Sequence, residues 1–329
     1  MTDPVKELQK VKADLNAYGE NMKQQTDAIF DQLEKMRTDW RKRMQVKSAD
    51  SFKGSGDVEV PTNQGKIRVG RITHTRETGK KQFAVTDGYT NIVVTSHNTT
   101  KLGHTLSPYV LKDSKGRLME NLWQFAKIYV QVSEQSHKEW SHDAEVHVLN
   151  YKKGQPITKI TPEYWKWRSK GMNHKYPVRY PNGYAGKAKC ISCLWPSSDS
   201  PLETLEEVEN QYAEMEQLDY ISARKRVYIP LYIHLAKQTE EFAELQEMLN
   251  HGENLQIMDV DGPDDTIYDD EVPAPYNTMT KGTHGVTSGV GSIEMTEENV
   301  KALLNDPTQP FGHGYCLAVA LLGKEEWLQ

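Results

Sequence analysis

The chain has 329 residues, 37% hydrophobic and 26% charged, so it is long and apolar enough to bury a core. The absence of an apolar run of about 18 residues argues against a transmembrane helix, and three cysteines are too few for a disulfide framework. The formal charge of −6 argues against a protein that coats nucleic acid with its whole surface. Because Met1–Pro4 lead into no basic segment followed by an apolar block, we expect no ordinary secretory signal. The few cysteines fit a reducing cytoplasm, and we expect that of a bacterial or viral host cell.

Residues 1–47 are expected to form a long helical arm. Apolar residues recur every seven positions, at Leu8, Leu15, Met22, Ile29 and Met36. This heptad allows a coiled coil that joins copies of the chain through residues 5–40, and a helix packed on its own domain is the alternative. The small and polar residues of 48–65 predict a linker after the arm.

Residues 66–329 are expected to form one α+β domain, mainly helical with a small β portion. β-branched residues predict strands between 66 and 95, with a turn at Asp87-Gly88, and a short buried strand is expected at 255–262. Apolar periodicity and capping residues predict helices at 120–131, 205–219, 231–250, 296–305 and 315–322. A basic and aromatic insertion around 150–200 and an acidic, Pro- and Gly-rich loop around 264–290 separate them.

The basic and aromatic segment 165–189 contains seven Lys or Arg residues and no acid. Its aromatic residues are Trp165, Trp167, Tyr176, Tyr180 and Tyr184. Cations interleaved with aromatic rings suit phosphates and stacked bases, so the segment indicates contact with a nucleotide or nucleic acid. A solvated loop with a few packed rings is the alternative.

Sequence motifs indicate neither a metal nor a cofactor. Cys190 and Cys193 form a single CxxC, and a zinc site needs further ligands at comparable spacing. Trp195-Pro196 follows where a thioredoxin-like motif would open a helix, so two buried cysteines are expected. The chain has no GxxxxGK[ST], GxSxG or HExxH pattern.

Two groups of carboxylates are candidates for acid–base chemistry. Glu120, Gln124 and Lys127 are spaced four and three residues apart, which places them on one stripe of a helix. Beside Trp123, the Glu120 carboxyl can have a raised pKa; an ordinary surface pair of Glu and Lys is the alternative. Asp259 and Asp261 follow an apolar run and form the second group.

Three motifs resemble the NADAR superfamily. They are Leu106-Ser-Pro-Tyr109, the segment Met119–Lys127 with its Glu-x-x-x-Gln-x-x-Lys spacing, and Phe311-Gly-His-Gly314 followed by Leu317–Gly323. The chain departs from the family pattern at Asn121, where a histidine is usual, and at Pro108, where an asparagine is usual.

The resemblance implies hydrolysis of an N-glycosidic bond, in an ADP-ribosylated nucleobase or a related nucleotide, without a cofactor. Glu120 would stabilise the cationic ribosyl centre or activate water, and Asp259 or Asp261 would orient the ribose or the water. Trp123 or an aromatic residue of 165–184 would stack on a base. The other implied substrate-binding residues are Ser107, Tyr109, Gln124, Lys127, Arg179, Lys187, Lys189, Gly312 and His313. The competing hypothesis is a non-catalytic nucleic-acid-binding or assembly protein, oligomerised by its N-terminal helix.

Overall fold

A computed structural model of the chain describes residues 64–74, 81–95, 100–133, 146–148, 153, 160–182, 189–196, 215–264, 280–281 and 290–329. All of them belong to the compact unit Asn63–Gln329. The expected helical arm 1–47 lies outside the described residues, as do nearly all of the expected linker and most of the acidic loop 264–290. Within the described part, no helix is both long and apolar enough to cross a membrane.

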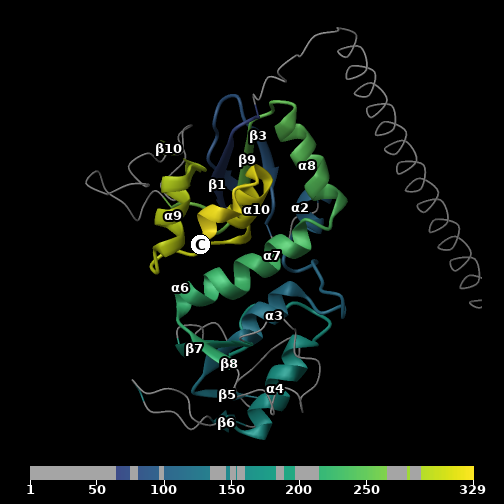
Figure 1. Ribbon diagram of the computed structural model, residues 1–329, viewed down its shortest axis with the longest axis vertical. Coiled ribbons are helices and arrows are strands. Elements are labelled where there is room, and N and C mark those ends of the chain that lie inside the picture. Colours follow the sequence, from purple (N-terminus) through teal and green to yellow (C-terminus); the bar gives the residue numbers. More distant parts are fainter. Residues whose placement is uncertain are drawn as a thin grey trace, which may run out of the picture. The chain divides into compact units, whose positions relative to one another are not determined.

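The described residues form an α+β fold around a mixed six-stranded sheet (Figure 1). Its strands are β1 (Ile67–His74), β2 (Lys81–Phe83), β3 (Thr90–Val93), β9 (Leu255–Asp259), β10 (Thr280–Lys281) and β11 (Gly291–Glu294). The order is β10-β11-β1-β9-β3, and β2 pairs with β1. β9 is parallel to both of its neighbours, β1 and β3, and all five of its residues are buried, as expected for a strand covered on both faces.

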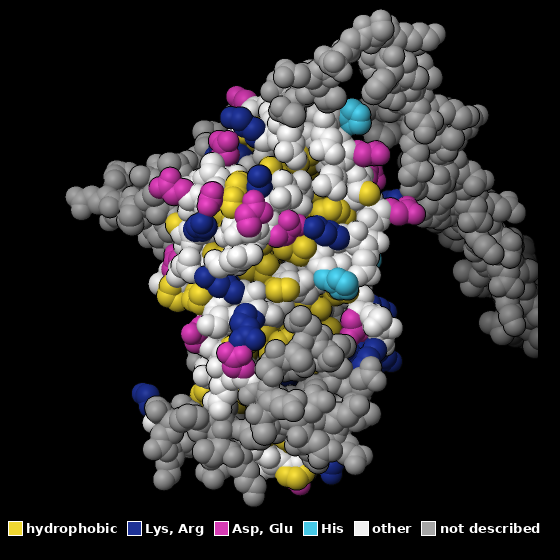
Figure 2. Space-filling model, in the orientation of Figure 1, with side chains coloured by type: hydrophobic (Ala, Val, Ile, Leu, Met, Phe, Trp, Pro, Cys, Tyr) yellow, Lys and Arg dark blue, Asp and Glu magenta, His cyan; other side chains and the backbone are white. Residues whose placement is uncertain are grey.

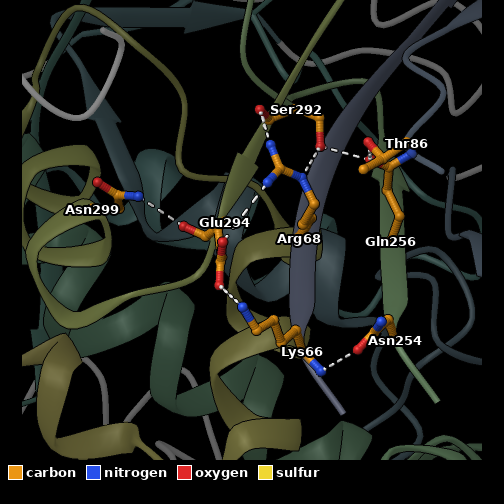
Figure 3. Close-up of polar contacts among 8 residues, drawn as sticks. All are labelled: Lys66, Arg68, Thr86, Asn254, Gln256, Ser292, Glu294 and Asn299. Atoms are coloured by element: carbon orange, nitrogen blue, oxygen red, sulfur yellow. Dashed lines mark hydrogen bonds and ion pairs between the residues drawn. The ribbon is translucent and has the colours of Figure 1, made fainter. Parts of the chain in front are cut away.

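The two faces of this sheet differ in chemistry because side chains alternate along each strand. Ile67, Val69, Ile257 and Ile293 belong to the main apolar core. Arg68, Gln256 and Ser292 occupy the other positions and form the polar network of Figure 3.

In this network, Arg68 Nε donates to Ser292 Oγ at 3.0 Å, and Ser292 Oγ donates to Gln256 Oε1 at 2.6 Å. Thr86 Oγ1 also donates to Gln256 Oε1, at 2.7 Å, so side chains join three adjacent strands to the segment before β3 (Figure 3). Glu294 lies 3.9 Å from Arg68, which gives the nearly buried guanidinium a counterion.

Helices surround the main apolar core beside this sheet. They are α2 (Lys101–Thr105), α7 (Ile229–Ala236), α8 (Glu240–Asn250), α9 (Glu297–Asn305) and α10 (His313–Leu322), with a short 3₁₀ helix at Glu325–Leu328. α10 is buried from His313 to Leu321 and contacts β1, β9, α7 and α8. It ends at Gly323, whose φ of 64° is the left-handed conformation that glycine adopts most readily.

A second group of elements surrounds a smaller core. It contains β4 (Lys127–Tyr129), β7 (Cys190–Pro196) and β8 (Met215–Leu218) in one sheet, the pair β5 (Gln131–Ser133) and β6 (Val146–Val148), and the helices α3 (Met119–Ala126) and α4 (Pro162–Met172). Figure 1 shows α6 (Tyr220–Ala223) and α7 between this group and the main sheet. α3 contributes Trp123 to the main core and Phe125 to the second core, so it joins the two.

Three expected helices are wrong in extent or type. The helix expected at 120–131 ends at Ala126, because Lys127–Tyr129 pair with β7 instead. Of the helix expected at 205–219, residues 215–218 form the strand β8, and Asp219 caps α6. The helix expected at 231–250 is two helices, because Thr239 leaves the helical conformation and caps α8.

Other local expectations are confirmed. Thr296 caps α9 by accepting a hydrogen bond from the Asn299 backbone, and Gly252 follows α8 with a φ of 85°. The buried strand expected at 255–262 is β9, which ends at Asp259 and leaves the next two residues in a turn. The terminal helix begins at His313, two residues earlier than expected.

Candidate functional site

A cavity of about 720 Å³ lies where α3, the carboxyl end of β9 and the amino end of α10 meet. Ligands commonly bind at the carboxyl ends of parallel strands, where the loops leave room. The residues that line it are Pro108, Tyr109, Glu120, Trp123, Gln124, Lys127, Tyr129, Arg179, Tyr180, Tyr220, Arg224, Tyr228, Val260, Asp261 and Pro307–His313. Ten candidate residues from the sequence therefore line one cavity: Tyr109, Glu120, Trp123, Gln124, Lys127, Arg179, Tyr180, Asp261, Gly312 and His313.

Glu120, Gln124 and Lys127 form a chain of hydrogen bonds along one wall of the cavity. Gln124 Nε2 donates to Glu120 Oε1 at 3.0 Å, and Lys127 Nζ donates to Gln124 Oε1 at 2.8 Å. An ammonium group only donates, so the Gln124 oxygen faces Lys127 and its amide nitrogen faces Glu120. These hydrogen bonds engage one carboxylate oxygen of Glu120, so the other is available to a ligand.

The environment of Glu120 opposes its ionisation. Burial raises the pKa of this carboxyl, although the Gln124 hydrogen bond and the charges of Lys127, Arg179 and His313 act in the opposite direction. The interpretation of Glu120 as an ordinary surface partner of Lys127 is therefore wrong, since only 7% of Glu120 is exposed.

Asp259 and Asp261 have different surroundings. Asp259 is fully buried and does not line the cavity; its Oδ2 accepts from the Gly314 backbone at 2.9 Å and lies 3.3 Å from His313 Nδ1. On the other side of the ring, His313 Nε2 contacts the Val94 carbonyl oxygen. Asp259 therefore fixes the His313 ring and the first turn of α10.

Asp261 faces the cavity two residues later. Burial and the nearby charge of Asp259 raise the pKa of the Asp261 carboxyl, while His313, Arg179 and Arg71 oppose the change. The carboxylates can approach α10 closely only because residue 312 is glycine, where a Cβ atom would lie 2.7 Å from both Asp259 Oδ2 and Asp261 Cβ.

Asn121 holds the segment that brings Arg179 and Tyr180 to the cavity. Its Nδ2 donates to the backbone oxygens of His174 and Tyr176, at 2.7 and 3.0 Å, and its Oδ1 accepts from the Val178 backbone at 2.8 Å. The Asn121 side chain is fully buried, and both its amide nitrogen and its carbonyl oxygen form hydrogen bonds. Asn121 thus has a structural role next to the site.

We expect Asn121→Ala to lower the free energy of unfolding by about 1–3 kcal/mol, because it removes hydrogen bonds to three backbone groups of 174–178, of which the Val178 amide is buried. Asn173→Ala is the matched control, since Asn173 makes one exposed hydrogen bond, to Ser169. Urea unfolding measures both variants. Equal stability of the two would contradict the anchoring role of Asn121.

Arg224 is a site residue that the sequence analysis missed. Its guanidinium donates to the backbone oxygens of Leu303, Leu304, Asp306 and Gln309, at 2.6 to 3.3 Å. Arg224 begins the π-helical turn Arg224–Tyr228, a feature frequent at functional sites. It therefore ties the cavity-lining segment after α9 to the α6–α7 region.

The aromatic residues of the cavity are not equally available to a ligand. Lys127 Nζ lies 4.8 Å from the centre of the Trp123 ring, and Tyr228 packs against the same ring at 5.1 Å. Trp123 is consequently a wall of the cavity and not a stacking surface. Tyr220, which is 45% exposed and lies beside Arg224, presents a more accessible ring.

Several expected ligand-binding residues lie elsewhere. Trp165 and Trp167 are buried in the second core, so the expectation that they stack on bases is wrong. Ser107 is buried and accepts a hydrogen bond from the Tyr109 backbone, and Lys189 is exposed; neither lines the cavity. Tyr184 and Lys187 lie outside the described residues.

On the face seen in Figure 2, the described Lys and Arg side chains are interspersed with Asp and Glu, so this face has no broad area of positive charge. Within the described ranges, no group of three or more His, Cys, Asp or Glu residues is arranged to hold a metal ion. The cationic and acidic groups of the cavity are therefore the main candidates for chemistry on the described part of the chain.

Comparison of the chain with protein-family models, with curated proteins and with solved structures finds no match.

Proposed function

We propose that the cavity hydrolyses an N-glycosidic bond of a nucleotide or an ADP-ribosylated nucleobase, with Glu120 and Asp261 as the acting carboxylates. The observation that carries this proposal is the convergence of two carboxylates of raised pKa, buried Glu120 and half-buried Asp261, on one cavity that also presents cations and aromatic rings. Departure of a base leaves an oxocarbenium-like ribosyl centre, which a nearby carboxylate stabilises and which water must then attack.

In this proposal, Glu120 stabilises the ribosyl cation or activates the water, and Asp261 orients the ribose or the water. Asp259 is a positioning residue, since its carboxylate holds α10 and His313. Arg179 and Lys127 neutralise phosphate oxygens, and Tyr220 offers a ring to the base. The resemblance to the NADAR superfamily supports the same reaction class.

The expected pH dependence of kcat/KM follows from the ionisation state in which Glu120 acts. Both roles given to Glu120 need the carboxylate, and burial raises its pKa. We therefore expect kcat/KM to rise with pH through an ionisation above the ordinary carboxyl range and to fall as pH drops through it. A rate profile between pH 4 and pH 8 measures this; activity that increases as Glu120 becomes protonated would contradict the assigned role.

Turnover assays with two variants separate this proposal from the non-catalytic alternative. DNA that carries ADP-ribosylated guanine and free ADP-ribose conjugates are incubated with the protein, and released ADP-ribose is read by mass spectrometry. We expect release by the parent, binding without release by Glu120→Gln, and weakened binding by Arg179→Met. A parent that binds without release, with binding retained in Glu120→Gln, would instead favour a binding or assembly protein.

A further inference from the structure

Cys190 and Cys193 lie on the same face of their sheet because β7 contains an irregularity. Lys127 pairs with Cys193, Ile128 with Ser192, and Tyr129 with Cys190, so β7 has one extra residue opposite β4. In a regular strand, positions three apart face opposite sides. Here the extra residue makes Cys190 and Cys193 equivalent to positions two apart, opposite two residues of β4 that themselves share a face.

This arrangement gives the two cysteines a backbone spacing that a disulfide can bridge. Two strand residues span roughly 6.6 Å along the chain, which falls within the Cα separation of up to about 6.8 Å seen in disulfides. The Cys190 thiol donates to the Ser192 backbone oxygen at 3.3 Å, and the Cys193 thiol is close enough to lower the pKa of Cys190. Both cysteines are reduced in the structure.

The two thiols have unequal reactivity. The Cys193 thiol lowers the pKa of Cys190 to about 7, against the effect of burial and with help from the charge of Lys127. The reciprocal interaction and burial raise the pKa of Cys193. Cys190 is half-buried at the start of β7, and β8 pairs only with residues 193–196. Cys190 thus has the properties of an attacking thiolate and Cys193 those of a resolving thiol.

We propose that Cys190 and Cys193 form a site of reversible oxidation, which reacts with small-molecule disulfides to give an intramolecular Cys190–Cys193 disulfide. The Cys190 thiolate attacks one sulfur of the small disulfide, and the first small thiolate leaves. Cys193 then loses its proton and attacks the Cys190 sulfur of the mixed disulfide, which releases the second small thiolate. The protein loses two electrons and two protons, and the small disulfide gains them as two thiols.

This site is distinct from the proposed glycosidic chemistry but adjoins it. Lys127 and Tyr129, the cross-strand partners of the two cysteines, line the cavity. Oxidation removes the thiolate beside Lys127, whose ammonium is also hydrogen-bonded to Gln124. The redox state of the pair therefore changes the charge balance at one end of the Glu120 hydrogen-bond chain.

The test uses the full chain, incubated with oxidised glutathione, then alkylated and analysed by intact mass and peptide mapping. We expect the parent to lose two hydrogens and to yield a peptide with an internal Cys190–Cys193 bond, which dithiothreitol reverses. Cys193→Ser should accumulate one glutathione at Cys190, because the resolving thiol is missing. Parent protein whose Cys190 and Cys193 stay fully alkylatable after oxidation would overturn the proposal.

Cys316 supplies an internal control because it is fully buried and its pKa is raised by burial. Cys316→Ser should leave disulfide formation unchanged. The alkylation rate of Cys190 in the reduced parent should increase about 10-fold between pH 6 and pH 8, against roughly 75-fold for a thiol with an ordinary pKa of about 8.5. The proposal would also be overturned if the alkylation rate of Cys190 followed the pH dependence of an ordinary thiol and was no higher than the rate of Cys316.

Discussion

Glu120→Gln is expected to lower the single-turnover rate of N-glycosidic hydrolysis by roughly 10²- to 10⁴-fold, the usual contribution of a general acid or base. The glutamine side chain keeps the shape of Glu120 and can accept the Gln124 hydrogen bond, but it can neither take a proton from water nor carry negative charge. Rapid-mixing kinetics with ADP-ribosylated guanine in DNA measure the effect. Binding should persist, because Lys127 and Arg179 are unchanged.

The same substitution is expected to stabilise the fold at neutral pH. The folded pKa of Glu120 is raised, so the folded state resists ionisation, and the parent loses stability as pH rises through that pKa. Glu120→Gln removes this loss, and its advantage over the parent should shrink as pH falls toward the unfolded pKa. Glu297→Gln, on the exposed face of α9, is the matched control and should change neither rate nor pH dependence. Equal rates for Glu120→Gln and the parent would remove Glu120 from the mechanism.

Arg224→Met is expected to have the largest effect on stability, a loss of about 2–4 kcal/mol in the free energy of unfolding. The guanidinium is 2% exposed and donates to four backbone oxygens between residues 303 and 309, which methionine cannot do. Because that segment leads into the cavity wall 307–313, ligand affinity should decrease as well. Urea unfolding and ligand titration measure the two effects.

Arg226→Met is the matched control for Arg224. It lies two residues away in the same π-helical turn, where its exposed side chain pairs with Glu216. An exposed ion pair contributes about 0–1 kcal/mol, so this variant should remain close to the parent. If Arg224→Met were as stable as Arg226→Met, the anchoring role of Arg224 would be wrong.

Local spacing predicted the carboxylate wall of the cavity but not where its helix ends. Glu120, Gln124 and Lys127 form the expected stripe because spacings of four and three residues follow the helical turn. The helix ends at Ala126 because Lys127–Tyr129 pair with residues about 60 positions later in the chain. The sequence pattern of about a dozen neighbouring residues, from which a helix is predicted, cannot reveal a strand partner that far away.

The division of roles between Asp259 and Asp261 also depends on distant contacts. The sequence places both at the end of a buried strand. The contacts that engage the Asp259 carboxylate come from Gly314 and His313, which are more than 50 residues away in the chain. Arg224 was missed for the same reason, since its acceptors lie about 80 residues further on. The composition of 165–189 was misleading because Trp165 and Trp167 face a core that composition cannot reveal.

Isotope incorporation tests most directly whether water cleaves a carbon–nitrogen bond in this cavity, as we propose. The parent and Glu120→Gln are each incubated with ADP-ribosylated guanine in H₂¹⁸O, and the products are read by mass spectrometry. We expect ADP-ribose carrying one ¹⁸O at the former glycosidic carbon, an unlabelled guanine, and almost no product with the variant. Absence of product from the parent, label in the base, or equal release by both proteins would contradict the proposal.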